Sequence, residues 1–160
     1  MQHGHEVEII DGQEARLSEE KLVERALALK PDMIGLSAYS PFFHCNTTLA
    51  ESIKAKAPDM PIAIGGPHIT IMKEEAFLPQ FDYAFVGEAE FSFPEFLDTY
   101  EAGGDLSTVK GIIFRRDGQV INTGDAQPIS LESAAGIESS GTRGKGYPLD
   151  QFPLPARNLL

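Results

Sequence analysis

The sequence has one cysteine, Cys45, and no tryptophan among its 160 residues. A single cysteine forms no internal disulfide, which indicates a reducing, cytoplasmic compartment. It also cannot supply the set of thiolates that holds an iron–sulfur cluster or a cysteine-rich zinc ion. Catalysis by Cys45 with the adjacent His44 is disfavoured, because neighbours in sequence seldom reach the geometry of a nucleophile and its base.

Positive charge is scarce and long apolar runs are missing. Thirteen Lys and Arg stand against twenty-four Asp and Glu, which gives a net charge of −11. Nucleic-acid-binding proteins need a basic face to neutralise phosphates, so nucleic acid and anionic membranes are poor partners, and neither is predicted to bind. Since no run reaches the ~18 apolar residues of a membrane span, and the N-terminus has no apolar signal-peptide core, no membrane insertion is predicted.

Short apolar strands and amphipathic helices alternate along residues 1–105. The pattern predicts strands at 6–10, 33–37, 61–64 and 83–86, and helices at 18–30, 44–57, 73–78 and 93–100. Strands without polar alternation are typical of parallel sheets covered on both faces. The fold class is therefore α/β, a Rossmann- or flavodoxin-like parallel sheet with helices on both faces. Doubly wound sheets usually have more strands than this, so either this sheet is unusual or a further strand–helix unit belongs before residue 1.

Residues 106–160 have a different character. Asp117-Gly118 separates β-like runs at 111–116 and 119–122, and this dipeptide favours a type I′ hairpin, which we assign to residues 106–124. Residues 125–146 are rich in Ser, Gly and Ala and are interpreted as a flexible loop or linker. Residues 147–160 hold three prolines and predict an extended strap that leads toward a further domain.

Ligands of open α/β sheets bind beyond the carboxyl ends of the strands, so the residues that follow each predicted strand are the candidate ligand contacts. Glycine lets a ligand approach the backbone, and serine offers a donor and acceptors. Such an edge suits a nucleotide-like ligand better than proton transfer, and no catalytic residue or metal ligand is assigned. The candidates are Asp11, Ser37, Tyr39, Ser40, Gly65, Gly66, Pro67, His68, Gly87, Glu88 and Glu90.

Each candidate also has a purely structural explanation. Gly65-Gly66 alone is consistent with a tight turn, and His68 with a half-buried loop histidine. Glu88 and Glu90 suit the first turn of the next helix, where carboxylates interact favourably with the helix dipole. The sequence has no Walker A and no G-x-G-x-x-G motif, the fingerprints of phosphate-binding loops.

The order of these pieces resembles the cobalamin (vitamin B12)-binding domain of B12-dependent radical S-adenosylmethionine (SAM) proteins. The resemblance covers nearly the whole chain except residues 125–146. The segments that carry it are 4–11, 31–37 (Pro-Asp-Met-Ile-Gly-Leu-Ser), 64–68 (Ile-Gly-Gly-Pro-His), 81–90 (ending Val-Gly-Glu-Ala-Glu), 111–114 and 149–157 (Leu-Asp-x-x-Pro-x-Pro-x-Arg).

The resemblance implies a cobalamin site at the carboxyl edge of the sheet, with the corrin over the edge and its nucleotide tail in a slot beside the sheet. By motif position, Ser37 and Ser40 would meet the tail, and Gly65 and Gly66 would let it pass close to the backbone. Gly87 and Glu88 would border the nucleotide end, and Pro67 and His68 would lie near the rim.

Two family motifs do not occur in the sequence. Without D-x-H-x-x-G, no cobalt ligand is named, and without C-x-x-x-C-x-x-C the chain has no ligands for a radical SAM cluster. A [4Fe–4S] cluster and S-adenosylmethionine would therefore bind only in a downstream radical SAM core, in cis. No catalysis is expected from this chain alone, and methyl transfer or radical rearrangement would need that core.

Two other classes of function remain open at this point. One is a flavodoxin-like regulatory or interaction domain without a bound cofactor, and the other is an enzyme that uses a nucleotide or flavin. If the first strand of the sheet is missing, the chain exposes a sheet edge, and we expect marginal stability or self-association through it.

Overall fold

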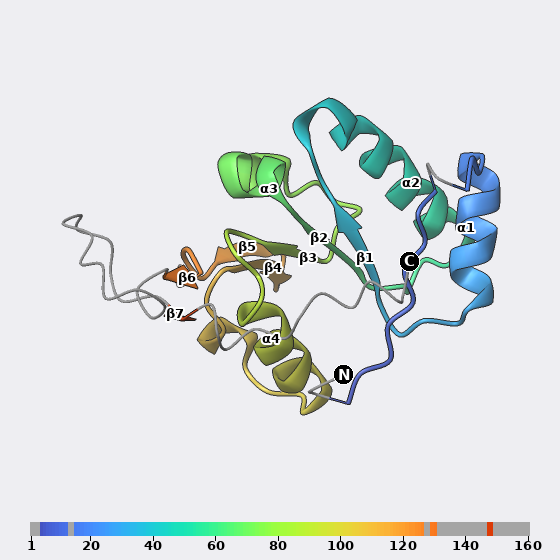
Figure 1. The fold of residues 1–160 in the computed structure, drawn as a ribbon. Helices are drawn as coiled ribbons and strands as arrows, with labels where there is room; N and C mark the ends of the chain where they lie inside the picture. Colours follow the sequence, from blue (N-terminus) through green and yellow to red (C-terminus); the bar gives the residue numbers. More distant parts are fainter. Residues whose placement is uncertain (1–3, 13–14, 127–128, 131–146, 149–160) are drawn as a thin grey trace.

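The computed structural model describes residues 4–12, 15–126, 129–130 and 147–148 of the chain. Its centre is one five-stranded sheet in the order β1-β2-β3-β4-β5. The strands β1 (Ile34–Ser37), β2 (Ile62–Gly65) and β3 (Tyr83–Phe85) are parallel. β4 (Ile112–Arg116) pairs antiparallel with β3, and β5 (Gln119–Asn122) pairs antiparallel with β4. The predicted α/β class with a mainly parallel sheet is confirmed, and the hairpin continues that sheet instead of standing apart (Figure 1).

Helices cover both faces of the sheet (Figure 1). The α-helices are α1 (Glu19–Ala28), α2 (Phe43–Lys56), α3 (Pro67–Met72) and α4 (Ser92–Glu101). Short 3-10 helices, η1 (Ser40–Phe42), η2 (Lys73–Ala76) and η3 (Leu106–Thr108), lie in the connections. As the sequence predicts, Ser18 caps α1 by accepting a hydrogen bond from the Lys21 amide.

The core has two halves, one on each face of the sheet. On one face, Ile62 and Ile64 of β2 pack with Val23 of α1 and Ile53 of α2. On the other face, Ala63 and Phe85 pack with Phe96 of α4 and Ile112 of β4. Since side chains alternate between the faces of a strand, neighbouring residues of β2 belong to different halves. α4 packs against β2, β3 and β4. On the same face, Gly35 and Ser37 of β1 remain exposed.

The tight turn between β4 and β5 is the one that the sequence predicts. Asp117 has a φ of 52° and Gly118 a φ of 77°, and positive values at both central residues define the type I′ turn. An aspartate tolerates this region better than most residues, and glycine enters it without strain.

Two predicted elements are wrong. Residues 6–10 form no strand, although their sequence alternates as a strand does. The predicted helix at 73–78 begins earlier, at Pro67, because proline suits the first helical position, and residues 73–76 continue it as a 3-10 turn.

Two short strands of the C-terminal region are among the described residues. β6 (Ile129–Ser130) pairs parallel with β7 (Tyr147–Pro148) in a separate two-stranded sheet. Most of the predicted linker at 125–146, and the strap beyond Pro148, lie outside the described residues. Within the described part of the chain, no helix is long and apolar enough to span a membrane.

Candidate functional site at the carboxyl edge of the sheet

The ends of β1, β2 and β3 meet at one edge because these strands are parallel. The register sets Ser37 beside Gly65, and Ile64 beside Ala84. The polypeptide therefore leaves the sheet at Ser37, Gly65 and Phe85 on the same side of the molecule. This is the edge at which the sequence places its candidate residues.

Gly66 brings the connections after β1 and β2 into contact. Its φ is +107°, and a Cβ atom at this position would lie 2.8 Å from the Ala38 carbonyl oxygen. The same carbonyl accepts a hydrogen bond from the His68 amide at 3.1 Å. A residue with a side chain cannot reproduce this approach, so the second glycine of the pair is required by the local fold.

Thr70 joins the connections after β2 and β3. Its hydroxyl donates to the Gly66 carbonyl at 3.2 Å and accepts from the Gly87 amide at 3.0 Å. Gly87 also has a positive φ, of 86°. These contacts hold the polypeptide close to the sheet edge, and sequence reasoning gave no role to Thr70.

His68 is fixed in the first turn of α3 and is not a loop residue. Its ring lies 4.2 Å from the Phe43 ring, centroid to centroid, and its Nδ1 is 3.0 Å from the Ser40 hydroxyl oxygen. The candidates Ser40 and His68, which are 28 residues apart in sequence, are thus brought together. Their contact joins the segments that follow β1 and β2.

A groove lies on the α4 face of the sheet, over β1 and β2. Its volume is about 290 Å³, and none of its described lining residues carries a charge. Small residues form the floor of the groove. In the strand register, Gly35 of β1 lies beside Ala63 of β2, and Ser37 lies beside Gly65. Phe85 and Phe93 are its aromatic walls, and Leu36, Ile64 and Ala89 complete the lining.

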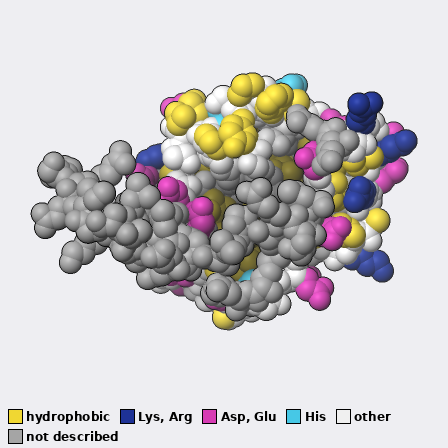
Figure 2. All heavy atoms as spheres, viewed as in Figure 1, with side chains coloured by type: hydrophobic (Ala, Val, Ile, Leu, Met, Phe, Trp, Pro, Cys, Tyr) yellow, Lys and Arg dark blue, Asp and Glu magenta, His cyan; other side chains and the backbone are white. Residues whose placement is uncertain are grey.

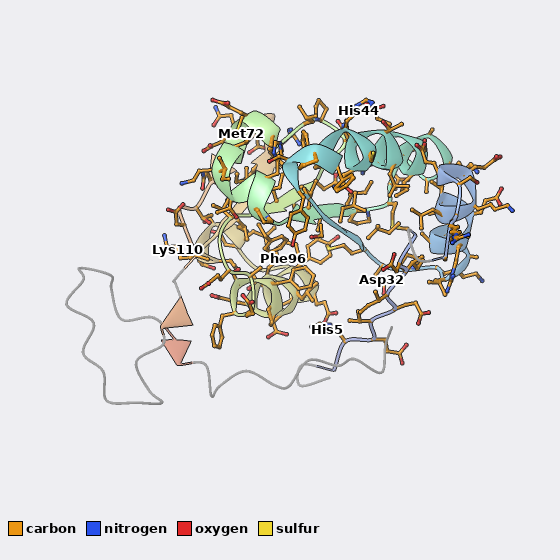
Figure 3. The ribbon with its side chains drawn as sticks, turned by 45° about the horizontal axis from the view of Figure 1, so that its top comes forward. His5, Asp32, His44, Met72, Phe96 and Lys110 are labelled. Atoms are coloured by element: carbon orange, nitrogen blue, oxygen red, sulfur yellow. The ribbon has the colours of Figure 1, made fainter. Side chains whose placement is uncertain are left out.

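The upper side of the molecule carries exposed apolar side chains from the segments that follow β1 and β2. Tyr39 is 57% exposed and Phe42 54%, while Ile71 and Met72 of α3 are 73% and 38% exposed. We call these four residues the apolar rim. Figure 2 shows hydrophobic side chains gathered over α3 and the start of α2, and Figure 3 shows Met72 and His44 on this same side.

The structure separates the candidates into groups. Ser37 and Gly65 line the groove, Gly66 and Gly87 shape the edge, and Ser40 and His68 pair beside it. Tyr39 and Pro67 are exposed at the starts of η1 and α3, and Glu90 is exposed in the connection before α4.

Asp11 needs a correction. The prediction placed it at the end of a strand, but residues 6–10 form none, and so no strand delivers Asp11 to this edge.

Glu88 does not line the groove. It borders a second cavity, of about 280 Å³, together with Ser92, Lys110 and Asp125. Nearby, a hydrogen bond from Lys73 to the Asp125 carboxylate, 2.7 Å long, raises the pKa of Lys73. Charge is therefore found around the second cavity, whereas the groove is apolar and neutral.

Sequence reasoning missed most of the groove lining, including Gly35, Ala63, Ala89 and Phe93. A signal was present, since small residues at alternate positions of two adjacent strands, Gly-x-Ser and Ala-x-Gly, leave room on one face. No pattern in the sequence predicts the position of α4, which leaves that face of the sheet open over β1.

The groove fits a flat, uncharged ring system. Its floor of small residues leaves space above the sheet, and its phenyl walls offer edge and face contacts to an aromatic group. The Ser37 hydroxyl supplies a hydrogen-bonding group, while the Ser37 carbonyl is held by the Asn46 amide at 3.1 Å. The volume accommodates a heteroaromatic base but not a tetrapyrrole, which would have to lie outside, over the edge and the rim.

Comparison with known proteins identifies the same kind of domain. The family model of the B12 binding domain matches residues 1–97. An uncharacterized methyltransferase of Pyrococcus horikoshii is 28% identical over 158 residues, which are 98% of this chain and 31% of the relative. An anaerobic magnesium-protoporphyrin IX monomethyl ester cyclase of Synechocystis is 31% identical over 131 residues, 75% of this chain and 25% of the relative.

Solved structures share the fold. The radical SAM methyltransferase TsrM of Kitasatospora setae, with cobalamin and a [4Fe–4S] cluster bound, superposes with a TM-score of 0.67 at 19% identity, over 78% of this chain and 24% of that one. The cobalamin-dependent radical enzyme OxsB, with aqua-cobalamin and S-adenosylmethionine bound, gives a TM-score of 0.59 at 18% identity, over 68% of this chain and 16% of that one. This chain thus spans about a third or less of the proteins it resembles.

Proposed function

Since the chain belongs to the family of B12-binding domains, we propose that it holds cobalamin with the nucleotide tail in the groove and the corrin over the carboxyl edge. The observation that carries this proposal is the neutral groove of about 290 Å³, which opens beside Ser37 and Gly65. These are two of the residues that the motif positions assign to the tail.

Each part of the edge has a role in this arrangement. Ser37 hydrogen-bonds the tail, and Gly65 leaves the space that a side chain would fill. Gly66 and Gly87 keep the backbone close to the sheet, so that the tail can slide past it. Pro67, Ser40, His68 and the apolar rim support the periphery of the corrin.

Bound cobalamin would supply an organometallic cobalt centre, and the residues of this chain bind and orient the cofactor. In this proposal the chemistry belongs to a radical SAM core in the same polypeptide, which carries the [4Fe–4S] cluster and S-adenosylmethionine. The relatives that are two to four times longer than this chain support such an arrangement. The single cysteine supports a reducing, cytoplasmic location.

Binding is tested by adding hydroxocobalamin to the purified chain, desalting the mixture and recording the visible spectrum. The wild-type chain is expected to retain corrin absorbance in proportion to protein. Ser37→Phe puts a phenyl ring into the groove and is expected to abolish retention, while Ser37→Ala removes only the hydroxyl and weakens binding by roughly three- to tenfold.

Val120→Phe is the matched control, because Val120 is 47% exposed on β5 and does not line the groove. Retention by Ser37→Phe equal to that of Val120→Phe would contradict the assignment of the groove. If the wild-type chain retains flavin mononucleotide or a nucleoside triphosphate instead of the corrin, the nucleotide-using alternative replaces the proposal. A chain that retains none of these ligands supports the regulatory or interaction domain.

A further inference from the structure

The groove over β1 and β2 offers few hydrogen-bonding groups to a ring bound in it. Among its described lining residues, Ser37 has the only polar side chain. A serine hydroxyl provides a single donor and acceptor lone pairs. The other described lining residues are apolar or, at the two glycines, have no side chain. A polar ligand atom that faces the groove away from Ser37 therefore meets carbon.

The backbone around the groove is also occupied. In a β-sheet the N–H and C=O groups point toward neighbouring strands in the plane of the sheet, and not toward its faces. The Ala38 amide donates to the Gly65 carbonyl at 2.7 Å, which joins β1 to β2 beside the groove. On the α4 side, the Ala89 carbonyl accepts from the Phe93 amide at 2.9 Å. These groups are not available to a ligand.

The aromatic walls of the groove are held in place by a third ring. Phe85 and Phe93 stand edge to face, with their ring centroids 5.0 Å apart and their planes at 78°. The Phe96 ring, which has no exposed surface, contacts both, at centroid distances of 5.2 and 6.3 Å. Because rings in a close-packed core have little room to turn, the walls present phenyl carbon to the groove in a fixed arrangement.

This lining matters because corrinoids differ in the base at the end of the nucleotide tail. In cobalamin the base is 5,6-dimethylbenzimidazole, which has a single ring nitrogen free to accept a hydrogen bond. Where adenine replaces it, the base has further ring nitrogens and an exocyclic amino group. The Ser37 hydroxyl can satisfy the one acceptor of the benzimidazole, but it leaves several polar atoms of adenine facing carbon.

We propose that the groove selects corrinoids whose tail ends in a benzimidazole over corrinoids whose tail ends in a purine. This inference rests on the proposed function, in which the tail occupies the groove, and it adds the chemical class of base that fits there. Selection arises because buried polar atoms of a purine lose water without gaining a partner. Ser37 acts by offering one partner, and Ala89 and Phe93 act by offering none.

The test compares the dissociation constants of three corrinoids for the purified chain. These are cobalamin, the same corrinoid with adenine as its base, and cobinamide, which has no base. Binding is measured by anaerobic equilibrium dialysis in the cobalt(I) form, in which the metal holds no axial ligand and each base is free. We expect cobalamin to bind at least about tenfold more tightly than the adenine corrinoid, and more tightly than cobinamide.

The outcomes separate the selectivity from the proposed function. If cobalamin and the adenine corrinoid bind equally, and both bind more tightly than cobinamide, the selectivity is overturned and the proposed function stands. Tighter binding of the adenine corrinoid overturns the selectivity in the same way. Equal binding of all three corrinoids, or binding of none, overturns the placement of the tail in the groove and the selectivity with it.

A pair of serine variants tests the cause of the selectivity. Ala89→Ser adds a hydroxyl to the groove lining and is expected to lower the ratio of the two affinities, cobalamin over the adenine corrinoid, by about threefold or more. Val120→Ser is the matched control, because Val120 is 47% exposed on β5 and lies outside the groove, and it should leave the ratio unchanged. A ratio that is the same in Ala89→Ser as in Val120→Ser would contradict the role given to the apolar lining.

Discussion

At the scale of single residues, the carboxyl edge depends on close backbone approaches. Gly66 combines a φ of +107° with a ψ of 178°, a region of backbone space that only glycine occupies readily. A Cβ atom at Gly66 would meet the backbone of Ala38, and not a side chain that could rotate away. The edge is therefore intolerant of substitution at this position, whatever its ligand.

We predict that Gly66→Ala destabilises the protein by roughly 2–3 kcal/mol, because the added methyl group meets the Ala38 carbonyl and the backbone conformation is strained. Urea unfolding followed by circular dichroism measures the change. Gly35→Ala is the matched control in the neighbouring strand, where a Cβ atom meets nothing within 4 Å, and it should leave stability within about 1 kcal/mol of wild type. Equal losses in the two variants would contradict the close approach.

A second residue-scale prediction concerns acid. Hydrogen bonds from Arg116 and then from Ser107 lower the pKa of Asp105 from 3.8 to about 2. A carboxylate with a depressed pKa in the folded state stabilises the fold above its ordinary pKa, and this contribution is lost as pH falls from about 4 to about 2. NMR titration of the Asp105 carboxyl carbon should show the low value in wild type and a return toward 3.8 in Arg116→Met. The contribution is expected to be small because the pair is exposed, and an unchanged pKa in Arg116→Met would be inconsistent with this cause.

At the scale of elements, side chains of β4 and α2 hold the connection between α3 and β3. The Arg115 guanidinium of β4 donates to the carbonyls of Phe77 and Phe81, each at 2.7 Å, and lies 4.1 Å from the centre of the Phe77 ring. Lys54 of α2 donates to the Asp82 carboxylate and to the Met60 carbonyl, each at 2.8 Å. These contacts set where β3 begins, and hence where its carboxyl end meets the groove.

We predict that Arg115→Lys lowers the free energy of unfolding by about 1–2 kcal/mol, because a lysine ammonium cannot bridge two carbonyls and stack on Phe77 at once. Chemical denaturation gives the value. Arg116→Lys, one residue further along β4, keeps a single ion pair with Asp105 and should cost less than about 0.5 kcal/mol. A larger loss for Arg116→Lys than for Arg115→Lys would reverse this interpretation.

Most elements could be predicted because each has a local signal: Ser18 as a cap, apolar runs for β1 to β3, and Asp117-Gly118 for the turn. Of the two wrong predictions, the one at residues 6–10 does not depend on a local signal. The strand pattern at residues 6–10 is genuine, but pairing depends on a neighbour that the described residues do not contain. The start of α3 at Pro67 is missed when the Gly-Gly-Pro-His motif is interpreted only as a loop.

The candidate site was predictable where it follows strand ends, as at Ser37, Gly65 and Gly66, and not where it depends on packing. Phe93 lines the groove because α4 packs over β2, β3 and β4 and leaves β1 uncovered, and Phe85 of β3 forms the wall beside it. No sequence pattern encodes that offset. The motif order identified the family, and the structure added the surface on which the family's ligand would rest.

At the scale of the whole molecule, the fold presents distinct surfaces around β1. The groove lies on one face of this strand, and the apolar rim lies on the segments that follow β1 and β2. In the proposed function, the nucleotide tail and the corrin therefore meet neighbouring surfaces at the carboxyl end of this strand.

The most direct test of the central claim is an amide chemical-shift map of the isotopically labelled chain during titration with hydroxocobalamin. We predict saturable shifts at Ser37, Gly65, Ala89 and Phe93, and shifts near zero at Asp117 and Gly118 on the far hairpin. Shifts confined to the hairpin, or a spectrum unchanged at saturating hydroxocobalamin, would contradict a cobalamin site at the carboxyl edge of this sheet.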